Sequence, residues 1–176
     1  MLYITILLIF VFFAGLAMTI NEGLWSNTVL LLCIILGGLF AILGGIPLGL
    51  YIIDQASVAK GNIWHCIFAG VWGVFIVSVT IMRVLVEKTS LTRVKFVPPL
   101  EQAAGPLMGL FVAVMFTSFA AFTMERIPFN AGQWPLAEAA GWQKSVFTYA
   151  RAPFHNVVTR FAESEGIRSE FFPKGR

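Results

Sequence analysis

The sequence predicts an all-α fold: a four-helix bundle integral to a membrane, followed by an amphipathic helical tail. The mean hydropathy is +0.83 and only 12% of the residues are charged, which is too apolar for a water-soluble globule. Four long stretches, about 1–20, 28–53, 61–83 and 103–124, contain no Asp, Glu, Lys or Arg except Arg83 at the end of the third. At about 1.5 Å per residue, each stretch is long enough to cross a hydrocarbon core of about 30 Å.

The charge balance does not indicate binding to nucleic acid. The net charge is +3 and the pI is near 9.1. The basic residues, however, lie beside apolar stretches and in the tail, where Lys and Arg ordinarily meet lipid headgroups. The sequence contains no basic motif of the usual nucleic-acid-binding kinds. We therefore expect the lipid bilayer, and not a nucleic acid, as a partner.

Residues 1–20 are predicted to form the first span, because they are uncharged and lack the positively charged start of a secretory signal. The segment 21–27 contains turn formers and a Trp suited to the headgroup region. It is predicted to be a tight surface turn in which Ser26 or Asn27 caps the next helix. The second span, 28–53, is longer than a bilayer requires, so it can tilt or kink.

Glycines and a proline interrupt the second half of the second span, among them Gly37, Gly44 and Pro47. One interpretation is a broken helix that lines a solute path, as in transporters. The other is close packing against a neighbouring helix, with a kink at the proline. We favour packing, because this span contains no charged residue that would bind a solute.

The third and fourth spans, 61–83 and 103–124, are predicted to form a membrane hairpin. Pro98-Pro99 in the connecting loop should break any helix before the fourth span. Gly105 and Gly109 form a G-x-x-x-G spacing, which places two bare backbone patches one turn apart on one helix face. We expect this face to contact a protein partner or a second copy of the chain. In all, helix packing is predicted at four glycines: Gly37, Gly44, Gly105 and Gly109.

The four spans would place both termini on one side of the membrane. The loop after the third span carries four basic residues on the other side: Arg83, Lys88, Arg93 and Lys95. Three basic residues accompany the termini: Lys60, Arg126 and Lys144. By the positive-inside rule, this margin of one charge favours both termini outside the cytoplasm.

Residues 125–176 are predicted to form an amphipathic helical tail at the membrane surface. Apolar residues between positions 146 and 161 follow helical spacing, while the basic residues fall largely elsewhere. Pro153 should kink this helix or divide it in two. The helix would either dock on a protein partner or lie on the chain's own bilayer or bundle. The candidate contact residues are Phe147, Phe154, Val158 and Phe161.

No catalytic, cofactor-binding or metal-binding residue is predicted, and we do not expect an enzyme. His65 lies in the third span, but the four spans contain no Asp, Glu or second His that would form a proton relay with it. No Ser–His pair, Asp pair or metal-ligand cluster lies at a matching membrane depth. Cys33 and Cys66 would lie near opposite membrane faces, too far apart for a disulfide.

The hairpin and the first turn resemble a known family. Leu85-Val86-Glu87-Lys88-Thr89-Ser90-Leu91, followed by a glycine-spaced fourth span, is similar to the colicin V production protein (CvpA) family. Asn21-Glu22-Gly23-Leu24-Trp25 resembles that family's glycine-aromatic entry into its second helix. The chain departs from the family at Val97-Pro98-Pro99-Leu100-Glu101, where Asp-Arg-x-Leu-Gly is common. The resemblance implies a small bacterial inner-membrane protein without known catalytic residues, linked to colicin V export and envelope integrity.

Three hypotheses for function follow. The first is a non-enzymatic scaffold or facilitator of the CvpA type in the bacterial cytoplasmic (inner) membrane, contacting a partner or a second copy through glycine-lined faces and the tail. The second is an accessory structural subunit of a larger membrane complex, respiratory or secretory. The third is a channel or transporter, which we disfavour because the spans offer few polar groups to line a path.

Overall fold

The computed structural model describes residues 2–56, 62–89, 98–125 and 139–164, and these residues contain five α-helices and no strand. The first four helices are long and apolar enough to cross a membrane. The predicted all-α fold with four apolar spans is therefore confirmed, and the chain is a multi-pass membrane protein. The helices are α1 (Leu2–Thr19), α2 (Leu24–Ala56), α3 (Ile63–Thr89), α4 (Pro98–Glu125) and α5 (Gly141–Ser164).

The turn between α1 and α2 is shorter than the sequence suggests. Helix α2 begins at Leu24, and the backbone N–H of Asn27 already donates to the carbonyl of Gly23, at 3.1 Å. The prediction that Ser26 or Asn27 caps this helix is therefore wrong, because both residues lie inside its first turns. Their positions leave the Asn27 side chain available for contacts with other helices.

The prolines do not divide any of the helices. Helix α4 begins at Pro98, five residues before the expected start at 103. Proline suits a first helical position, because its missing N–H would have no partner there. Helix α2 continues through Pro47 and α5 continues through Pro153, so neither is broken in two.

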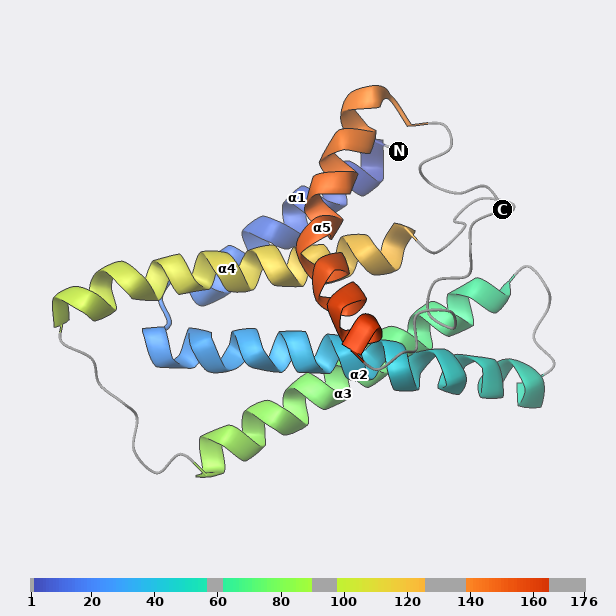
Figure 1. The fold of residues 1–176 in the computed structure, drawn as a ribbon, viewed down its shortest axis with the longest axis horizontal. Coiled ribbons are helices and arrows are strands. Elements are labelled where there is room, and N and C mark those ends of the chain that lie inside the picture. The colour runs from blue at the N-terminus through green and yellow to red at the C-terminus, as the bar shows by residue number, and fades with distance from the viewer. Residues whose placement is uncertain (1, 57–61, 90–97, 126–138, 165–176) are drawn as a thin grey trace.

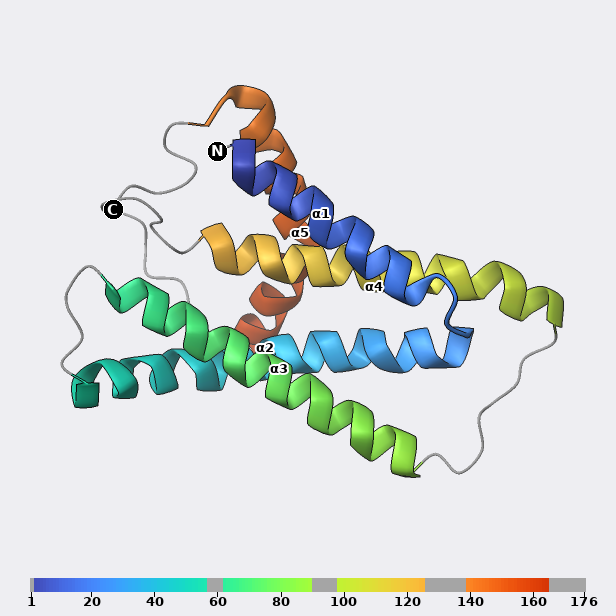
Figure 2. The ribbon, with the colours of Figure 1, turned by 180° about the vertical axis from the view of Figure 1, so that it is seen from behind.

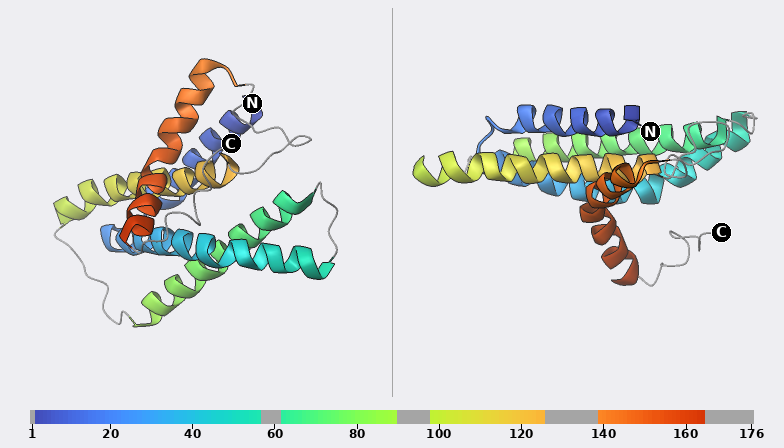
Figure 3. Two further views of the ribbon diagram at one scale, coloured as in Figure 1. Left: turned by 45° about the vertical axis from the view of Figure 1, so that its right-hand side comes forward. Right: turned by 90° about the horizontal axis from the view of Figure 1, so that it is seen from above.

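Helix α4 lies in the middle of the arrangement. It packs against α1, α2 and α5, and α2 also packs along α3. Helix α1 crosses one face of α4 and α5 crosses the opposite face (Figures 1 and 2). The four apolar helices follow roughly the long axis of the molecule, whereas α5 runs steeply across α4 and α2 (Figures 1 and 3).

Helices α2 and α3 extend together beyond the end of α4 (Figure 1). Gly105 of α4 lies beside Leu24, the first residue of α2, so these two residues mark a common level. From that level α4 continues for about 30 Å to Glu125, while α2 continues for about 48 Å to Ala56. The neighbouring ends of α2 and α3 therefore project well beyond α4.

The core has two clusters that meet on α4 and α5. One joins α2, α3, α4 and α5, and its centre is aromatic: the rings of Phe75 and Phe119 stack at 4.2 Å between centroids, and Phe154 meets Phe119 edge-on at 5.2 Å. The other joins α1, α4 and α5 around Ile4, Leu8 and Phe147. Helix α5 thus shares its core with the membrane spans.

Candidate functional site

In the described residues, the polar side chains that form hydrogen bonds or ion pairs lie mainly between helices. The first group is the turn junction, formed by Thr19 and Asn27 against Gly105 and Gly109 of α4. Asn27 is fully buried, and its side-chain NH₂ group lies within hydrogen-bond distance of the backbone carbonyls of Thr19 (2.9 Å), Glu22 (3.3 Å) and Gly105 (3.0 Å). Because this group has two hydrogens, two of the three carbonyls share one of them. One side chain therefore links the end of α1, the turn and the start of α4.

Thr19 forms the other half of the turn junction. Its hydroxyl lies 2.9 Å from the carbonyl oxygen of Gly15 in its own helix and 3.1 Å from that of Gly109 in α4. This approach needs the glycine, since a Cβ at Gly109 would lie 3.0 Å from the Thr19 carbonyl oxygen. The hydroxyl has one proton, so it donates to one of these carbonyls at a time.

The Oδ1 atom of Asn27 has no hydrogen-bond partner. Rotating the amide by half a turn would place this oxygen against the three carbonyl oxygens that its NH₂ group now satisfies. The three carbonyls therefore fix the orientation of the Asn27 amide group. Its hydrogen bonds to them hold the side chain in place, although the Oδ1 acceptor has no partner.

The second group is the α5 junction, formed by Ser118 and Glu125 of α4 with Arg151 and Phe154 of α5. The buried hydroxyl of Ser118 accepts a hydrogen bond of 2.8 Å from the backbone N–H of Phe154. Pro153 precedes this amide, and a proline ring disturbs the helical bonding around it. The serine thus supplies an acceptor for an amide beside a proline inside a packed helix.

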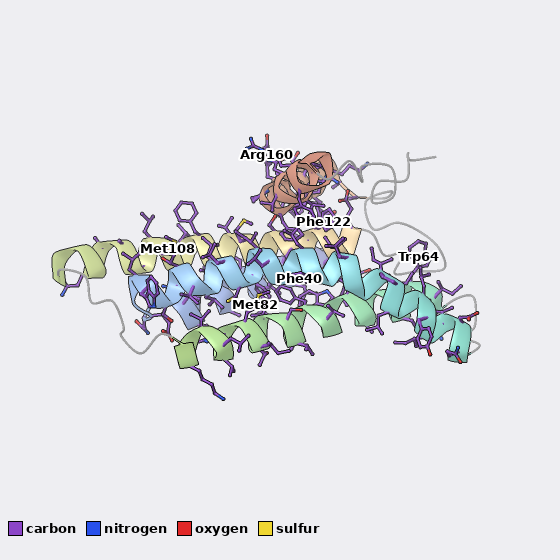
Figure 4. All side chains as sticks on the ribbon, turned by 60° about the horizontal axis from the view of Figure 1, so that its bottom comes forward. Phe40, Trp64, Met82, Met108, Phe122 and Arg160 are labelled. Atoms are coloured by element: carbon purple, nitrogen blue, oxygen red, sulfur yellow. The ribbon has the colours of Figure 1, made fainter. Side chains whose placement is uncertain are left out.

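The α5 junction also contains an ion pair. The Arg151 guanidinium donates to both carboxylate oxygens of Glu125, with the two side chains 32% and 18% exposed. The pair lies at the last residue of α4, so it marks the level at which this helix ends. Figure 4 shows Phe122 projecting from α4 towards α5, where its ring lies 5.6 Å from that of Phe154.

The third group consists of glycines whose backbone holds α2 against α3. A Cβ at Gly45 would lie 2.4 Å from the Cα of Val71, and one at Gly49 would lie 2.7 Å from the Cα of Ile67. A Cβ at Gly70 would lie 2.7 Å from the carbonyl oxygen of Gly45. The two backbones therefore touch, and only glycine permits that approach.

The four predicted packing glycines occupy different surroundings. Gly37 lies against Val79 of α3, whose Cγ2 atom would be 2.6 Å from an added Cβ. Gly44 is exposed and has only ordinary contact with Val74, at 3.7 Å. Gly105 and Gly109 lie against the α1–α2 turn of the same chain, so that part of their surface is occupied internally. A contact of this face with a partner stays a prediction.

The predicted contact residues of the tail point mostly inwards. Phe147, Phe154 and Val158 are buried in the two core clusters of this chain, whereas Phe161 is exposed. Of the alternatives left open for this helix, the structure places it on the chain's own bundle. Residues 126–138 and 165–176 of the tail lie outside the described residues.

Other reactive side chains lie apart from these junctions. His65 is exposed near the start of α3, and Cys33 and Cys66 are free thiols. Within the described residues, no group of three or more His, Cys, Asp or Glu side chains is arranged to hold a metal ion. Chemically, the junctions bind helices to one another.

Sequence reasoning missed the interhelical bonds of Asn27 and Ser118 and the close contact at Gly70, and it did not single out Gly45 and Gly49 among the glycines of the second span. Asn27 and Ser118 had a usable signal, since a polar side chain within an apolar helix commonly bonds to a neighbouring helix. The glycines had no such signal, because the sequence does not show which side of α2 faces α3.

Comparisons with protein-family models, with curated proteins and with solved structures find no match to this chain. The resemblance to the colicin V production family therefore stays a prediction based on the motifs quoted above.

Proposed function

We propose that this chain is a non-enzymatic scaffold or facilitator in a bacterial inner membrane, acting in envelope integrity or in export of the colicin V type. The resemblance of the hairpin and of the first turn to the CvpA family supports this role and this location. The count of basic residues supports placing both termini outside the cytoplasm. The expected partners are the bilayer and either another membrane protein or a second copy of the chain.

One structural observation carries the scaffold role. Three buried polar side chains bond one helix to another: Asn27 and Thr19 bond to α4, and Ser118 bonds to α5. In enzymes and transporters, polar groups converge on a reacting or permeating molecule. Here they converge on the backbone of neighbouring helices, which is an arrangement suited to holding a shape.

The experiment is deletion of the gene in its host, with envelope permeability to a dye and export of a colicin V-type peptide as readouts. The wild-type gene should restore both. A His65→Ala/Cys66→Ala variant should restore them equally, because a scaffold needs neither group. Failure of this variant, at normal abundance in the membrane, would contradict a non-enzymatic role. A deletion strain with normal permeability and export would contradict the proposal as a whole.

A second candidate is an accessory subunit of a larger membrane complex, and the projecting ends of α2 and α3 favour it. Beyond the level of Glu125 these ends expose large apolar side chains: Leu48, Leu50, Tyr51, Ile52 and Trp64. Neighbouring subunits would cover such a surface. An accessory subunit should copurify from native membrane with unrelated chains at fixed stoichiometry, which a scaffold with transient partners would not do. Solute flux in proteoliposomes would favour a channel over both.

A further inference from the structure

Helices α2 and α4 run in step along the bundle. Gly105 of α4 lies beside Leu24 of α2, and further along a Cβ at Gly38 would lie 3.3 Å from the ring of Phe119. Both partners of the second contact are 14 residues beyond those of the first. Equal numbers of residues from the first contact therefore mark equal levels in the two helices.

Helix α3 runs antiparallel to α2 in a register that stays constant. Three glycines of α2 fix it: Gly37 lies against Val79, Gly45 against Val71, and Gly49 against Ile67. Arg83 is four residues beyond Val79, so it lies level with Cys33 of α2. By the step shared with α4, it also lies level with Val114, in the middle of the apolar stretch of that helix.

The apolar stretches of α3 and α4 are therefore offset along α2. At one end, the stretch of α3 stops at Met82, about 18 Å short of the level at which the stretch of α4 starts. At the other end, α3 starts at Ile63, about 15 Å beyond the level of Met124. The similar offset at both ends shows two stretches of similar length at different levels.

Helix α1 shares the level of α4 and not that of α3. Its register is fixed by Gly15 against Ala113 and by Thr19 against Gly109. The chain thus has α1 and α4 at one level, α3 at another, and the longer α2 between them.

A bilayer perpendicular to α2 and α4 would not enclose both levels. It would place the charge of Arg83 in the middle of the hydrocarbon, at a cost of at least about 2.5 kcal/mol. It would also leave the exposed side chains of Leu48 and Tyr51 outside the hydrocarbon. A bilayer inclined to these two helices encloses both apolar stretches and leaves Arg83 at its surface.

The lengths of the apolar stretches agree with an inclined bilayer. The 18 residues of α1 and residues 63–82 of α3 extend about 27 and 30 Å, so both must stand upright to cross a core of about 30 Å. Residues 103–124 of α4 and 28–53 of α2 extend about 33 and 39 Å. To fit the same core, α4 must lean by about 25° and α2 by about 40°.

The directions of the helices show the same division. Helices α1 and α3 run in nearly the same direction, and both are oblique to α2 and α4 (Figures 1 and 2). The two shorter apolar stretches are thus the parallel ones. Register, length and direction are separate observations, and all three indicate the same position of the bilayer.

We propose that the bilayer encloses this protein along an inclined apolar belt, with α1 and α3 along the membrane normal, α4 leaning by about 25° and α2 by about 40°. Lipid then covers the projecting ends of α2 and α3. Arg83 and Lys88 lie among the headgroups of one leaflet, and the ion pair of Glu125 and Arg151 lies at the other surface. The proposal goes beyond the scaffold function and does not depend on it.

The test measures the depth of spin labels in the full chain, reconstituted in vesicles of phosphatidylglycerol and phosphatidylcholine. Single cysteines are introduced in a Cys33→Ala/Cys66→Ala background. The first pair is Phe13→Cys and Val84→Cys, two exposed positions whose levels along α2 differ by about 3 Å. Collisions with oxygen, which concentrates in hydrocarbon, are compared with collisions with a polar nickel complex.

The second pair is Tyr3→Cys, level with the end of α4, and Leu48→Cys, about 6 Å beyond that level. In the inclined belt, Phe13 and Leu48 lie in the hydrocarbon, whereas Val84 and Tyr3 lie near the surfaces. We expect the nickel-to-oxygen collision ratio to be about tenfold higher at Val84 than at Phe13, because a polar complex is excluded from hydrocarbon. The ratio should likewise be higher at Tyr3 than at Leu48.

Three results would overturn the proposal. Equal ratios at Phe13 and Val84, or a higher ratio at Leu48 than at Tyr3, would place the bilayer perpendicular to α2. Protection of Leu48 from both reagents would show that protein, and not lipid, covers the projecting ends. Each variant must keep the thermal midpoint of the background, and Phe10→Cys and Leu50→Cys replace Phe13→Cys and Leu48→Cys where one does not.

Discussion

The two sides of this bundle are held together by different means. On one side, α2 and α3 meet through bare backbone at Gly45, Gly49 and Gly70. On the other, α4 is joined to the α1–α2 turn and to α5 through the hydrogen bonds of Asn27 and Ser118. The comparison shows two routes to helix association in lipid, where apolar surface alone gives little preference between protein and acyl chains.

The difference predicts how each side responds to substitution. A backbone contact tolerates no added atom, because the neighbouring main chain has no room to move. When a hydrogen-bonding side chain is replaced by a smaller one, the contact loses only that hydrogen bond and part of the burial of the partner group. Substitutions in the α2–α3 contact should therefore cost more than substitutions in either polar junction.

The largest effect is expected from Gly45→Ala. The added Cβ would lie 2.4 Å from the Cα of Val71, so the two helices must separate. We expect a loss of about 3 kcal/mol, at the upper end of the range for overpacking. Thermal unfolding in detergent measures it. The matched control is Gly44→Ala, whose Cβ meets only Val74 at 3.7 Å and which should be neutral or slightly stabilising. Equal effects at the two positions would contradict the contact.

The next effect is expected from Asn27→Ala, which removes the three bonds from the side-chain amide to backbone carbonyls. A loss of about 2 kcal/mol is expected, because the buried carbonyls lose their side-chain donor, and an unsatisfied buried group costs about 1 to 3 kcal/mol. Thr28→Val is the control, since the Thr28 hydroxyl bonds only within α2, to Leu24. Chemical unfolding of the two variants separates them, and a larger loss for Thr28→Val would count against the turn junction.

A smaller effect is expected from Ser118→Ala, which removes the hydrogen bond between α4 and the backbone N–H of Phe154. The expected loss is about 1 kcal/mol, the typical net contribution of one hydrogen bond. Proteolysis of α5 should accelerate, because this bond holds α5 on α4. Ser145→Ala provides the comparison: its hydroxyl is exposed and bonds only to Gly141. No difference between the two serine variants would argue against this anchoring role.

The smallest effect is expected from the ion pair of Glu125 and Arg151. A double-mutant cycle with Glu125→Gln and Arg151→Gln should give a coupling of about 0.5 to 1 kcal/mol, because the pair is partly exposed and screened by water. Added salt should weaken the coupling. A parallel cycle between Glu125 and Arg160 should show no coupling, since Arg160 lies on the side of α5 opposite Arg151. An equally large coupling with Arg160 would contradict the ion pair of Glu125 with Arg151.

Much of the fold was predictable from local sequence. The four spans were found with ends within six residues of the observed ones, because an uncharged stretch of sufficient length is a strong signal in itself. The differences at the ends have local causes: Pro98 starts α4 early, and Asn27 lies inside α2 because the turn closes at Gly23. Of the two packing glycines predicted in α2, Gly37 lies in a close contact with α3. Gly44 does not, and the close contact is made by its neighbour Gly45.

The junctions were less predictable. Asn27 was expected to cap its own helix, because the same side chain serves caps and interhelical bonds equally well. Ser118 bonds to the backbone of a residue 36 positions later, which no local pattern reveals. Phe147, Phe154 and Val158 were predicted as contact residues of α5, and the sequence left open which surface they contact; in the structure they are buried in the chain's own core.

The sequence by itself determined how many apolar helices this chain makes, their order and their approximate lengths, since these depend on short-range composition. Only the tertiary structure decided which glycines touch, what Asn27 and Ser118 bind, and where α5 lies. The physical reason is that a helix apolar on all sides gives no sign of its rotation. Which residues of a helix face its neighbour depends on how closely the two backbones can approach, and that depends on both helices together.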